Sequence, residues 1–209
     1  MTLDQSESAD SRTNLRERKK SATRRALEEA ALDLFKKKGF ARTSVDEIAA
    51  AADVSRSTFF RYYGSKEAVF FDDTDTQGER FLDRLVRRPG TEGPLAAFRE
   101  ALIEVSAMAE EEDGTRDRAI LRRELMLTDP TLNGRRAEEF EKWTAKIAHA
   151  FAQRAGRSDA DAEDRVAAAI CMAATEEIGE EWRRLVDTVG AATAIQTGFE
   201  RVRRLIADV

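Results

Sequence analysis

The sequence predicts an all-α protein of about nine helices, with a three-helix N-terminal domain followed by a larger helical domain. The first observation is composition: 209 residues contain only 3 prolines and 11 glycines, while alanine, glutamate and arginine are abundant. The second is periodicity, because apolar residues recur at intervals of three and four along most of the chain. The third is that no segment shows the alternation typical of strands, and no internal repeat is present.

The first helix is predicted from about residue 16 to residue 38. Residues 1–15 are polar and lack a period, which predicts a disordered tail. Leu27, Ala31 and Leu34 then share one helical face. Three lysines in the last turn complement the helix dipole, and Gly39 suits a left-handed cap, so we expect the helix to end there.

Two short helices joined by a tight turn are expected next. Ser44 and Glu47 have the spacing of a capping box, which predicts a helix that runs out near Asp53. Ser55 is placed to cap a second short helix that ends at Tyr63. This arrangement is a helix-turn-helix, whose second helix enters the major groove of DNA.

Six further helices are separated by Gly, Pro and Asp breaks. We expect them at about 66–86, 94–111, 115–128, 130–155, 159–187 and 190–207. The predicted organisation is therefore a tail at 1–15, a helix-turn-helix domain at 16–65 and a larger domain at 66–209.

Charge is distributed unevenly along the chain. Residues 12–66 carry 14 Lys and Arg against 7 Asp and Glu, whereas the whole chain has a net charge of −5. A basic N-terminal quarter on an acidic body favours a polyanion partner for that quarter alone. The basic run at Arg16, Arg18, Lys19, Lys20, Arg24 and Arg25 fits phosphate or minor-groove contact and fits a solvated charge run equally well.

The stretch ALDLFKKKGFARTSVDEIAAAADVSRSTFFRYYGSKEAVF closely resembles the DNA-binding domain of the TetR family of transcriptional regulators. The matching residues are Gly39, Phe40, Thr43, Ser44, Val45, Ile48, Ala49, Ala52, Val54, Ser55, Thr58, Phe59, Tyr62, Ser65 and Lys66. The resemblance implies a homodimer that binds a palindromic double-stranded DNA operator, most commonly as a repressor released by a small molecule. It implies that the larger domain binds this effector and dimerises.

Three positions depart from the family pattern. Phe60 stands where the family has tyrosine, and Tyr63 stands where it has phenylalanine. Asp53 replaces the usual turn glycine, and we expect the turn to survive because aspartate tolerates a left-handed backbone.

Helical spacing divides the aromatic run between two roles. Phe59 and Tyr63 are four residues apart and are expected to pack inward, whereas Phe60 shares an outer face with Arg56 and Ser57. The resemblance implies that Thr43, Tyr62 and Lys66 contact phosphates, helped by Ser44 and Ser55. The predicted DNA-binding residues are therefore Thr43, Ser44, Ser55, Arg56, Ser57, Phe60, Arg61, Tyr62 and Lys66.

The effector is predicted to be a small apolar or amphipathic molecule. The segments FFRYYGSKEAVFFDD and TDPTLNGRRAEEFEKWTAKIAHAFAQRAG are similar in sequence to a subgroup that includes mycofactocin-type regulators. That subgroup's ligands include fatty acyl thioesters. Trp182 is a further possible anchor, and Arg122 with Arg123 fits either an anionic ligand group or a surface salt bridge. The candidate pocket residues are Phe81, Leu85, Phe98, Leu102, Val105, Leu121, Leu125, Trp143, Ile147, Phe151 and Glu176.

The last two helices are the expected dimer interface, as two helices from each subunit would form a four-helix bundle. Small residues on the first of them allow close approach. The candidate interface residues are Val166, Ile170, Ala173, Ala174, Ile178, Ile195, Phe199, Val202 and Ile206.

Other classes of function receive less support from the residues. His149 and Cys171 are the only histidine and cysteine, which leaves no structural zinc spacing, and no cofactor motif is present. The sequence shows no cluster of catalytic residues. A helical carboxylate enzyme stays an alternative, as does a DNA-binding regulator controlled by a protein partner.

No apolar run is long enough to span a membrane, so a cytoplasmic protein is expected.

Overall fold

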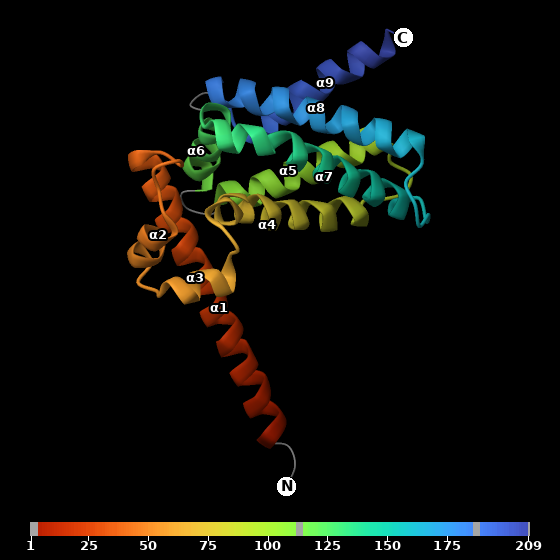
Figure 1. Ribbon diagram of the computed structural model, residues 1–209. Coiled ribbons are helices and arrows are strands. Elements are labelled where there is room, and N and C mark those ends of the chain that lie inside the picture. The colour runs from red at the N-terminus through yellow and green to blue at the C-terminus, as the bar shows by residue number, and fades with distance from the viewer. Residues whose placement is uncertain (1–3, 112–114, 186–188, 209) are drawn as a thin grey trace. The chain divides into compact units, whose positions relative to one another are not determined.

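The computed structural model describes residues 4–111, 115–185 and 189–208. Over these residues the chain forms nine helices and no strand, which confirms the all-α prediction (Figure 1). The helices are α1 Asp4–Lys38, α2 Val45–Ala51, α3 Arg56–Tyr62, α4 Lys66–Arg87, α5 Pro94–Glu111, α6 Thr115–Thr128, α7 Pro130–Arg154, α8 Ala162–Leu185 and α9 Ala191–Ala207.

Helix α1 begins well before its predicted start, because residues 4–15 are helical where the sequence predicted a disordered tail. The 35 residues of α1 contain no glycine and no proline. Extending an existing helix adds one hydrogen bond for each residue that is fixed, whereas nucleation is the costly step. The polar N-terminal residues can therefore continue the helix without burying an apolar face of their own.

The chain divides into two compact units whose boundaries lie within helices. Unit 1 runs through Asp73 and includes Leu121–Asp129, and unit 2 comprises Thr74–Ile120 and Pro130–Val209. The first turns of α4 and the second half of α6 therefore belong with the helix-turn-helix, whereas the sequence placed the division at residue 65. The physical reason is burial, since Val69, Phe70 and Phe71 at the start of α4 are all in the core.

An aromatic cluster holds unit 1 together. The ring of Phe40 lies 4.9 Å from that of Phe35 in α1 and 6.0 Å from that of Phe70 in α4, measured between centroids. Ile48 of α2 and Phe59 of α3 are fully buried as well. Helix α1 packs against α2, and α2 packs against α3, so the two short helices gain their stability from this shared core.

A buried carboxylate links three segments of unit 1. Asp72 of α4 accepts a hydrogen bond of 2.6 Å from the Tyr63 hydroxyl and forms an ion pair with Arg24 of α1. Burial and the hydrogen bond to Asp72 raise the pKa of Tyr63 above its usual value, so the phenol stays protonated. The tyrosine at position 63 therefore has an acceptor that a phenylalanine would leave unused.

Unit 2 is a bundle in which α7 packs against α8, while α9 packs against both α5 and α8 (Figure 1). Its core is mainly aromatic and aliphatic, with Phe81, Phe98 and Phe199 in ring-to-ring contact. Helices α8 and α9 approach closely at Gly198, where an added Cβ would lie 2.1 Å from Ile178 Cγ1. Among the described helices, none is both long and apolar enough to cross a membrane.

Two glycine substitutions test this close packing. We expect Gly198→Ala to lower the free energy of unfolding by about 1–3 kcal/mol, because the methyl group would overlap Ile178 where α8 and α9 approach most closely. Gly134→Ala in α7 is the matched control, since its Cβ would meet nothing within 4 Å. The control should gain about 0.5–1 kcal/mol from helix propensity. Chemical denaturation measures both, and equal stability of the two variants would contradict the packing.

Candidate functional site

The helix-turn-helix is held by caps at both of its helices. Ser44 and Glu47 form the predicted capping box at α2, and hydrogen bonds from Lys38 and Ser44 lower the pKa of Glu47 to about 2. Asp53 adopts the left-handed backbone that the turn requires, with φ of 54°. Ser55 then caps α3 by accepting a hydrogen bond of 3.0 Å from the amide of Thr58. Local sequence therefore defines both ends of the turn.

Helix α3 separates its aromatic residues as the spacing predicts. Phe59 is fully buried and Tyr63 is 4% exposed, whereas Phe60 is 45% exposed. The guanidinium of Arg56 lies 5.3 Å from the centre of the Phe60 ring, and that of Arg61 lies 5.4 Å from the Tyr62 ring. The outer face of α3 therefore presents two cations against aromatic rings, an arrangement suited to phosphates and base edges.

The outer face of α3 also exposes Ser55, Arg56 and Ser57. Arg56 also forms an ion pair with Asp46 of α2 at 2.5 Å, and the hydroxyls of Ser55 and Ser57 lie 2.8 Å apart. An exposed pair of this kind is weak, so DNA can replace Asp46 as the partner of Arg56 at little cost. Ser44 is exposed too, at the N-terminal end of α2.

Two predicted phosphate contacts have other partners in the structure. Thr43 is only 3% exposed, and its hydroxyl donates to the carbonyl of Gly39. The Lys66 ammonium donates to the carbonyls of Phe40, Ala41 and Thr43 at 2.8, 3.3 and 3.1 Å. Since an ammonium has three donors, Lys66 fixes the loop after α1 to the start of α4 and has no donor left for a phosphate.

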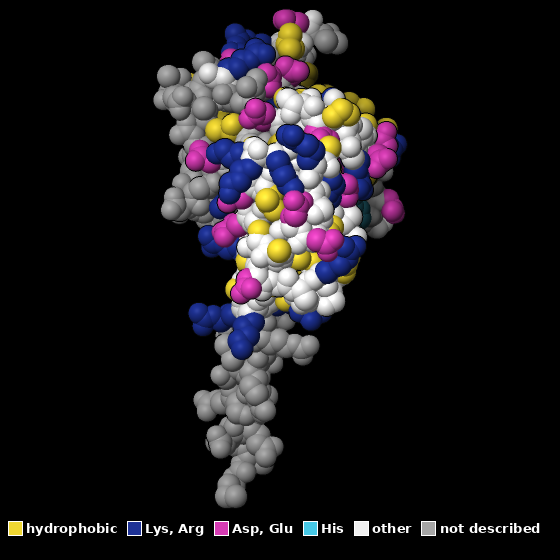
Figure 2. All heavy atoms as spheres, turned by 60° about the vertical axis from the view of Figure 1, so that its left-hand side comes forward, with side chains coloured by type: hydrophobic (Ala, Val, Ile, Leu, Met, Phe, Trp, Pro, Cys, Tyr) yellow, Lys and Arg dark blue, Asp and Glu magenta, His cyan; other side chains and the backbone are white. Residues whose placement is uncertain are grey.

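The basic character of the N-terminal quarter is partly neutralised within unit 1. Lys38 pairs with Glu47, and Arg25 pairs with Glu29 four residues further along α1. On the face seen in Figure 2, basic side chains lie among acidic and apolar ones and form no uniform basic patch. The face seen in Figure 2 therefore offers no extended basic surface.

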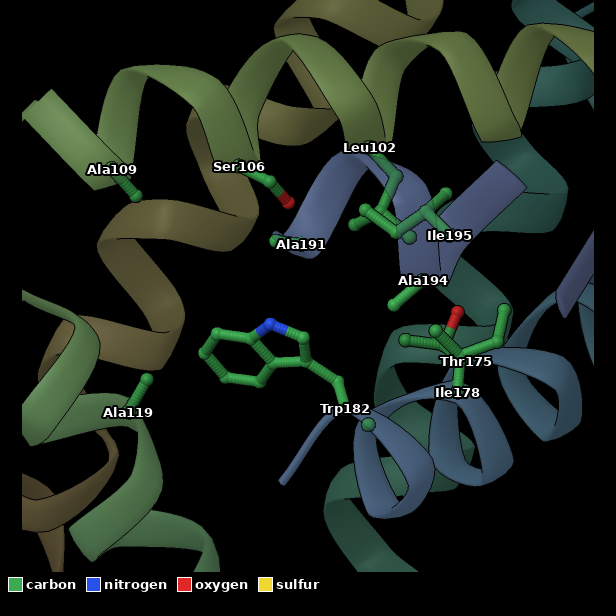
Figure 3. Close-up of a pocket in the computed structure, with 11 residues that line it drawn as sticks. Leu102, Ser106, Ala109, Ala119, Thr175, Ile178, Trp182, Ala191, Ala194 and Ile195 are labelled. Carbon is green, nitrogen blue, oxygen red and sulfur yellow. The ribbon is translucent and has the colours of Figure 1, made fainter. Parts of the chain in front are cut away.

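Unit 2 contains an apolar cavity of about 220 Å³ between α5, α6, α8 and α9 (Figure 3). Its lining is mostly small or aliphatic, with two hydroxyl groups and one indole. The lining residues are Leu102, Ser106, Ala109, Ala119, Thr175, Ile178, Gly179, Trp182, Ala191, Ala194 and Ile195.

Of the eleven residues predicted to line a pocket, only Leu102 does so at this cavity. Glu176 forms an ion pair with Arg136 at 2.9 Å, and Trp143 packs against Gly78. Leu121 and Leu125 belong to unit 1. The remaining residues are buried in the filled core of unit 2, namely Phe81, Leu85, Phe98, Val105, Ile147 and Phe151.

The predicted dimer residues fall into a buried and an accessible group. The buried group comprises Ala174, Ile178, Ile195 and Phe199, which pack in the core of their own unit, although Ala174 and Ile178 also line a groove between α8 and α9. Ile170 and Val202 are partly buried, and Val166, Ala173 and Ile206 are exposed. Leu205, which was not among the predicted residues, is 70% exposed beside Ile206. The accessible apolar surface therefore consists of Val166, Ile170, Ala173, Val202, Leu205 and Ile206, and is called the α8–α9 face below.

Two residues flagged in the sequence have structural roles. Arg122 is buried in unit 1, where it forms an ion pair with Glu28 and donates to the carbonyl of Phe70. It is therefore neither a surface salt bridge nor part of the cavity. Cys171 is fully buried, and burial raises the pKa of its thiol to about 12, which makes it unreactive at neutral pH.

Comparison with known proteins agrees with this geometry. Residues 27–72 match the family model of bacterial regulatory proteins of the tetR family, and residues 92–207 match that of the MftR C-terminal domain. The chain belongs to the TetR family. This TetR family protein is thus a DNA-binding transcriptional regulator and not an enzyme, which confirms the resemblance seen in the sequence.

Two relatives match nearly the whole chain. The transcriptional regulator TcmR of Streptomyces glaucescens is 33% identical over 93% of this chain and 89% of its own. The putative mycofactocin biosynthesis regulator MftR of Mycobacterium tuberculosis is 30% identical over 90% of this chain and 96% of its own.

Solved structures show the same fold at lower identity. NalD of Pseudomonas aeruginosa, a repressor of the MexAB-OprM efflux pump, has a TM-score of 0.58 at 19% identity, covering 88% of this chain and 96% of its own. The SmeT–triclosan complex has a TM-score of 0.59 at 19% identity, covering 86% and 89%.

Sequence reasoning missed most of the cavity because its walls are made by small residues. Alanine is too common in helices to mark a site, and four of the lining residues are alanines, at positions 109, 119, 191 and 194. The two hydroxyl residues, Ser106 and Thr175, have no distinctive neighbours in the sequence. Trp182 was the one available signal, since a tryptophan near the end of a charged helix is unusual. Its partners come from three other helices and could not be inferred from spacing.

Phe60 and Phe59 make a matched pair for testing the DNA-binding surface. We expect Phe60→Ala to weaken duplex binding at least several-fold while changing the free energy of unfolding by less than about 1.5 kcal/mol, because the ring is half exposed. Phe59→Ala should instead cost about 3–5 kcal/mol of stability. Fluorescence anisotropy and thermal unfolding measure the two effects, and unfolding of the Phe60 variant would show that the outer face is misassigned.

Lys66 and Arg61 separate a structural role from a phosphate contact. We expect Lys66→Met to lower the stability of unit 1 by about 1–3 kcal/mol, since three carbonyls lose their donor. The slope of log affinity against log salt should stay unchanged for this variant and fall by about one for Arg61→Met. A reduced slope for the Lys66 variant would restore its role as a phosphate ligand.

Proposed function

We propose that the protein is a homodimeric repressor that binds a palindromic operator and is released when a small molecule binds unit 2. The observation that carries this proposal is the near full-length similarity to the regulators TcmR and MftR, combined with the exposed outer face of α3. Because a bacterium keeps its DNA in the cytoplasm, the protein acts there.

DNA recognition follows from the short length of α3. A helix of seven residues reaches only a few base pairs, so one copy discriminates poorly between sequences. Arg56, Ser57, Phe60 and Arg61 are the proposed groove contacts, and Phe60 meets apolar groups such as thymine methyls where a tyrosine would offer a hydroxyl. Two copies related by a two-fold axis read successive major grooves and give the operator its symmetry.

The α8–α9 face is the proposed dimer interface. A groove of about 700 Å³ runs between the two helices, with Ile170, Val202 and Leu205 among its walls and the Arg201–Glu181 ion pair at its edge. An apolar groove with a charged rim suits the knobs of a second copy of the same helices. Burial of Leu205 and Ile206 in this way accounts for their exposure in a single chain.

The cavity of unit 2 supports control by a small molecule over control by a protein partner. It lies between four helices of one chain, is partly open to solvent, and has too small a volume for a peptide segment. The SmeT–triclosan complex shows a protein of this fold with a small molecule bound. Helix α6 contributes Ala119 to the cavity and Arg122 to unit 1, so the backbone itself links the two units.

Selection from a pool of duplexes tests operator binding. The purified protein is used to select duplexes from a random library and from fragments upstream of its own gene. We expect enriched sites with two-fold symmetry, two chains bound for each site, and affinity that falls steeply with salt. Absence of salt-sensitive duplex binding would contradict the regulator function, and asymmetric sites with one chain bound would contradict the dimer.

The dimer interface is tested by charge. We expect the double substitution Leu205→Glu with Ile206→Glu to weaken dimerisation at least about 100-fold, because buried carboxylates would repel one another across the two-fold axis. Val86→Glu on α4 is the matched control, since Val86 is also exposed but lies away from the α8–α9 face. Sedimentation velocity measures the state of each variant, and an intact dimer in the double variant would place the interface elsewhere.

A further inference from the structure

We propose that the cavity of unit 2 binds a compact, uncharged aromatic molecule that carries one hydrogen-bond acceptor, and that this acceptor receives the indole N–H of Trp182. The inference rests on the proposed function, because it gives the chemical class of the effector for which the protein would release DNA. Size, electrostatics and one unpaired donor each restrict the ligand independently.

Size is the first restriction. The cavity holds about 220 Å³, and a cavity of about 150 Å³ in another protein is known to bind benzene. The space exists because four lining positions are alanine and one is glycine, so the four helices surround a volume that their side chains do not fill. By proportion to benzene the space takes roughly nine heavy atoms, so the expected ligand has a one- or two-ring body, with any substituent extending toward the side that is open to solvent.

Electrostatics is the second restriction. None of the eleven lining residues is charged, and all but Ser106, Thr175 and Trp182 are purely apolar. Placing an anion or a cation against these eleven described residues would cost several kcal/mol, because none of them supplies a counter-ion. We therefore expect an uncharged ligand, and the acyl chain of a fatty acyl thioester exceeds the volume of the cavity.

The unpaired donor is Trp182 Nε1. This nitrogen is buried and has no hydrogen-bond partner, although a buried polar group is normally satisfied. Figure 3 shows the indole projecting into the middle of the space, with its nitrogen directed toward the side of Ser106 and Ala191. Because an indole N–H can only donate, the group that completes the site is an acceptor such as a carbonyl or ether oxygen.

The hydroxyl groups refine this assignment. Thr175 already donates its proton to the carbonyl of Cys171 at 2.8 Å, so toward the cavity it can only accept. Ser106 also directs its hydroxyl into the space (Figure 3). A second possible donor therefore lies on the side of the pocket toward which the indole nitrogen points. The flat indole face, with Ile178 and Ile195 nearby, favours an aromatic body that can stack.

Ile178 connects the cavity with the proposed dimer surface. It lines the cavity and also lines the groove between α8 and α9, and it packs against Gly198 where those helices meet most closely. A ligand that displaces Ile178 would change the spacing of α8 and α9. The geometry of the α8–α9 face would then depend on whether the cavity is filled.

The test uses the full chain labelled with 15N at its two tryptophans and three naphthalene probes of matched size. The probes are 1-acetonaphthone, which has one acceptor; 1-isopropenylnaphthalene, which has the same number of heavy atoms and no acceptor oxygen; and 1-naphthoate, which is charged. The indole resonance that disappears in Trp182→Phe assigns Trp182. We expect 1-acetonaphthone to shift this resonance downfield and to bind at least about tenfold more tightly than 1-isopropenylnaphthalene, the effect of one hydrogen bond.

Two variants and one control locate the binding site. In Trp182→Phe the preference for 1-acetonaphthone over 1-isopropenylnaphthalene should vanish while 1-isopropenylnaphthalene still binds. Ala194→Leu should abolish binding of both neutral probes by filling the cavity, and Ala145→Leu on the exposed side of α7 should leave both unchanged. Thermal unfolding confirms that each variant is folded. Equal affinity for all probes, tighter binding of 1-naphthoate or a fatty acyl thioester, or unchanged binding in Ala194→Leu would overturn the inference.

Duplex binding is measured on the same samples, so that the two proposals can fail separately. If the protein binds its selected duplex but none of the neutral probes, the cavity assignment is wrong and the regulator function stands. If the neutral probes bind as described and duplex binding is absent, the cavity assignment stands and the proposed function is wrong. Release of the duplex by 1-acetonaphthone in the parent chain, and its loss in Ala194→Leu, is the outcome that supports both.

Discussion

The organisation of unit 1 depends on one buried carboxylate. Asp72 of α4 pairs with Arg24 of α1 and accepts from Tyr63, the residue that ends α3. A buried charge is tolerated only when it is paired and hydrogen-bonded, so the three segments must keep the positions that satisfy it. The aromatic cluster supplies the apolar burial, and Asp72 supplies the directional constraint that fixes where α3 ends.

The hydrogen bond between Tyr63 and Asp72 offers a physical reason for the departure from the family pattern at positions 60 and 63. The hydroxyl at position 63 has Asp72 as its acceptor, whereas position 60 faces outward and carries a ring without a hydroxyl. The inner face of α3 therefore carries the hydroxyl that bonds to Asp72, and the outer face carries the apolar ring of Phe60. Arg56 lies over the exposed ring of Phe60 and Arg61 over the partly buried ring of Tyr62, which keeps both cations close to the proposed DNA-binding surface.

In unit 2 the size of small side chains, rather than a buried ion pair, determines how the helices pack. At Gly198 the absence of a side chain lets α8 and α9 touch, while the alanines of the cavity leave space that nothing fills. Both effects come from small residues, and one side chain, Ile178, separates the close contact from the hollow. Any molecule that occupies the cavity must act on the same two helices that expose Leu205 and Ile206.

Apart from the N-terminal extension of α1, the helices, the turn and the directions of Phe59, Phe60 and Tyr63 follow from the sequence alone, because caps, breaks and periodicity act over a few residues. The capping box at Ser44, the left-handed Asp53 and the inward Phe59 are examples. Only the tertiary structure shows that Lys66 donates hydrogen bonds to three backbone carbonyls and that α4 and α6 each contribute to both units. It also shows that small residues from four helices line a cavity beside Trp182. These outcomes depend on which side chains from distant helices reach one point in space, and no local pattern encodes that.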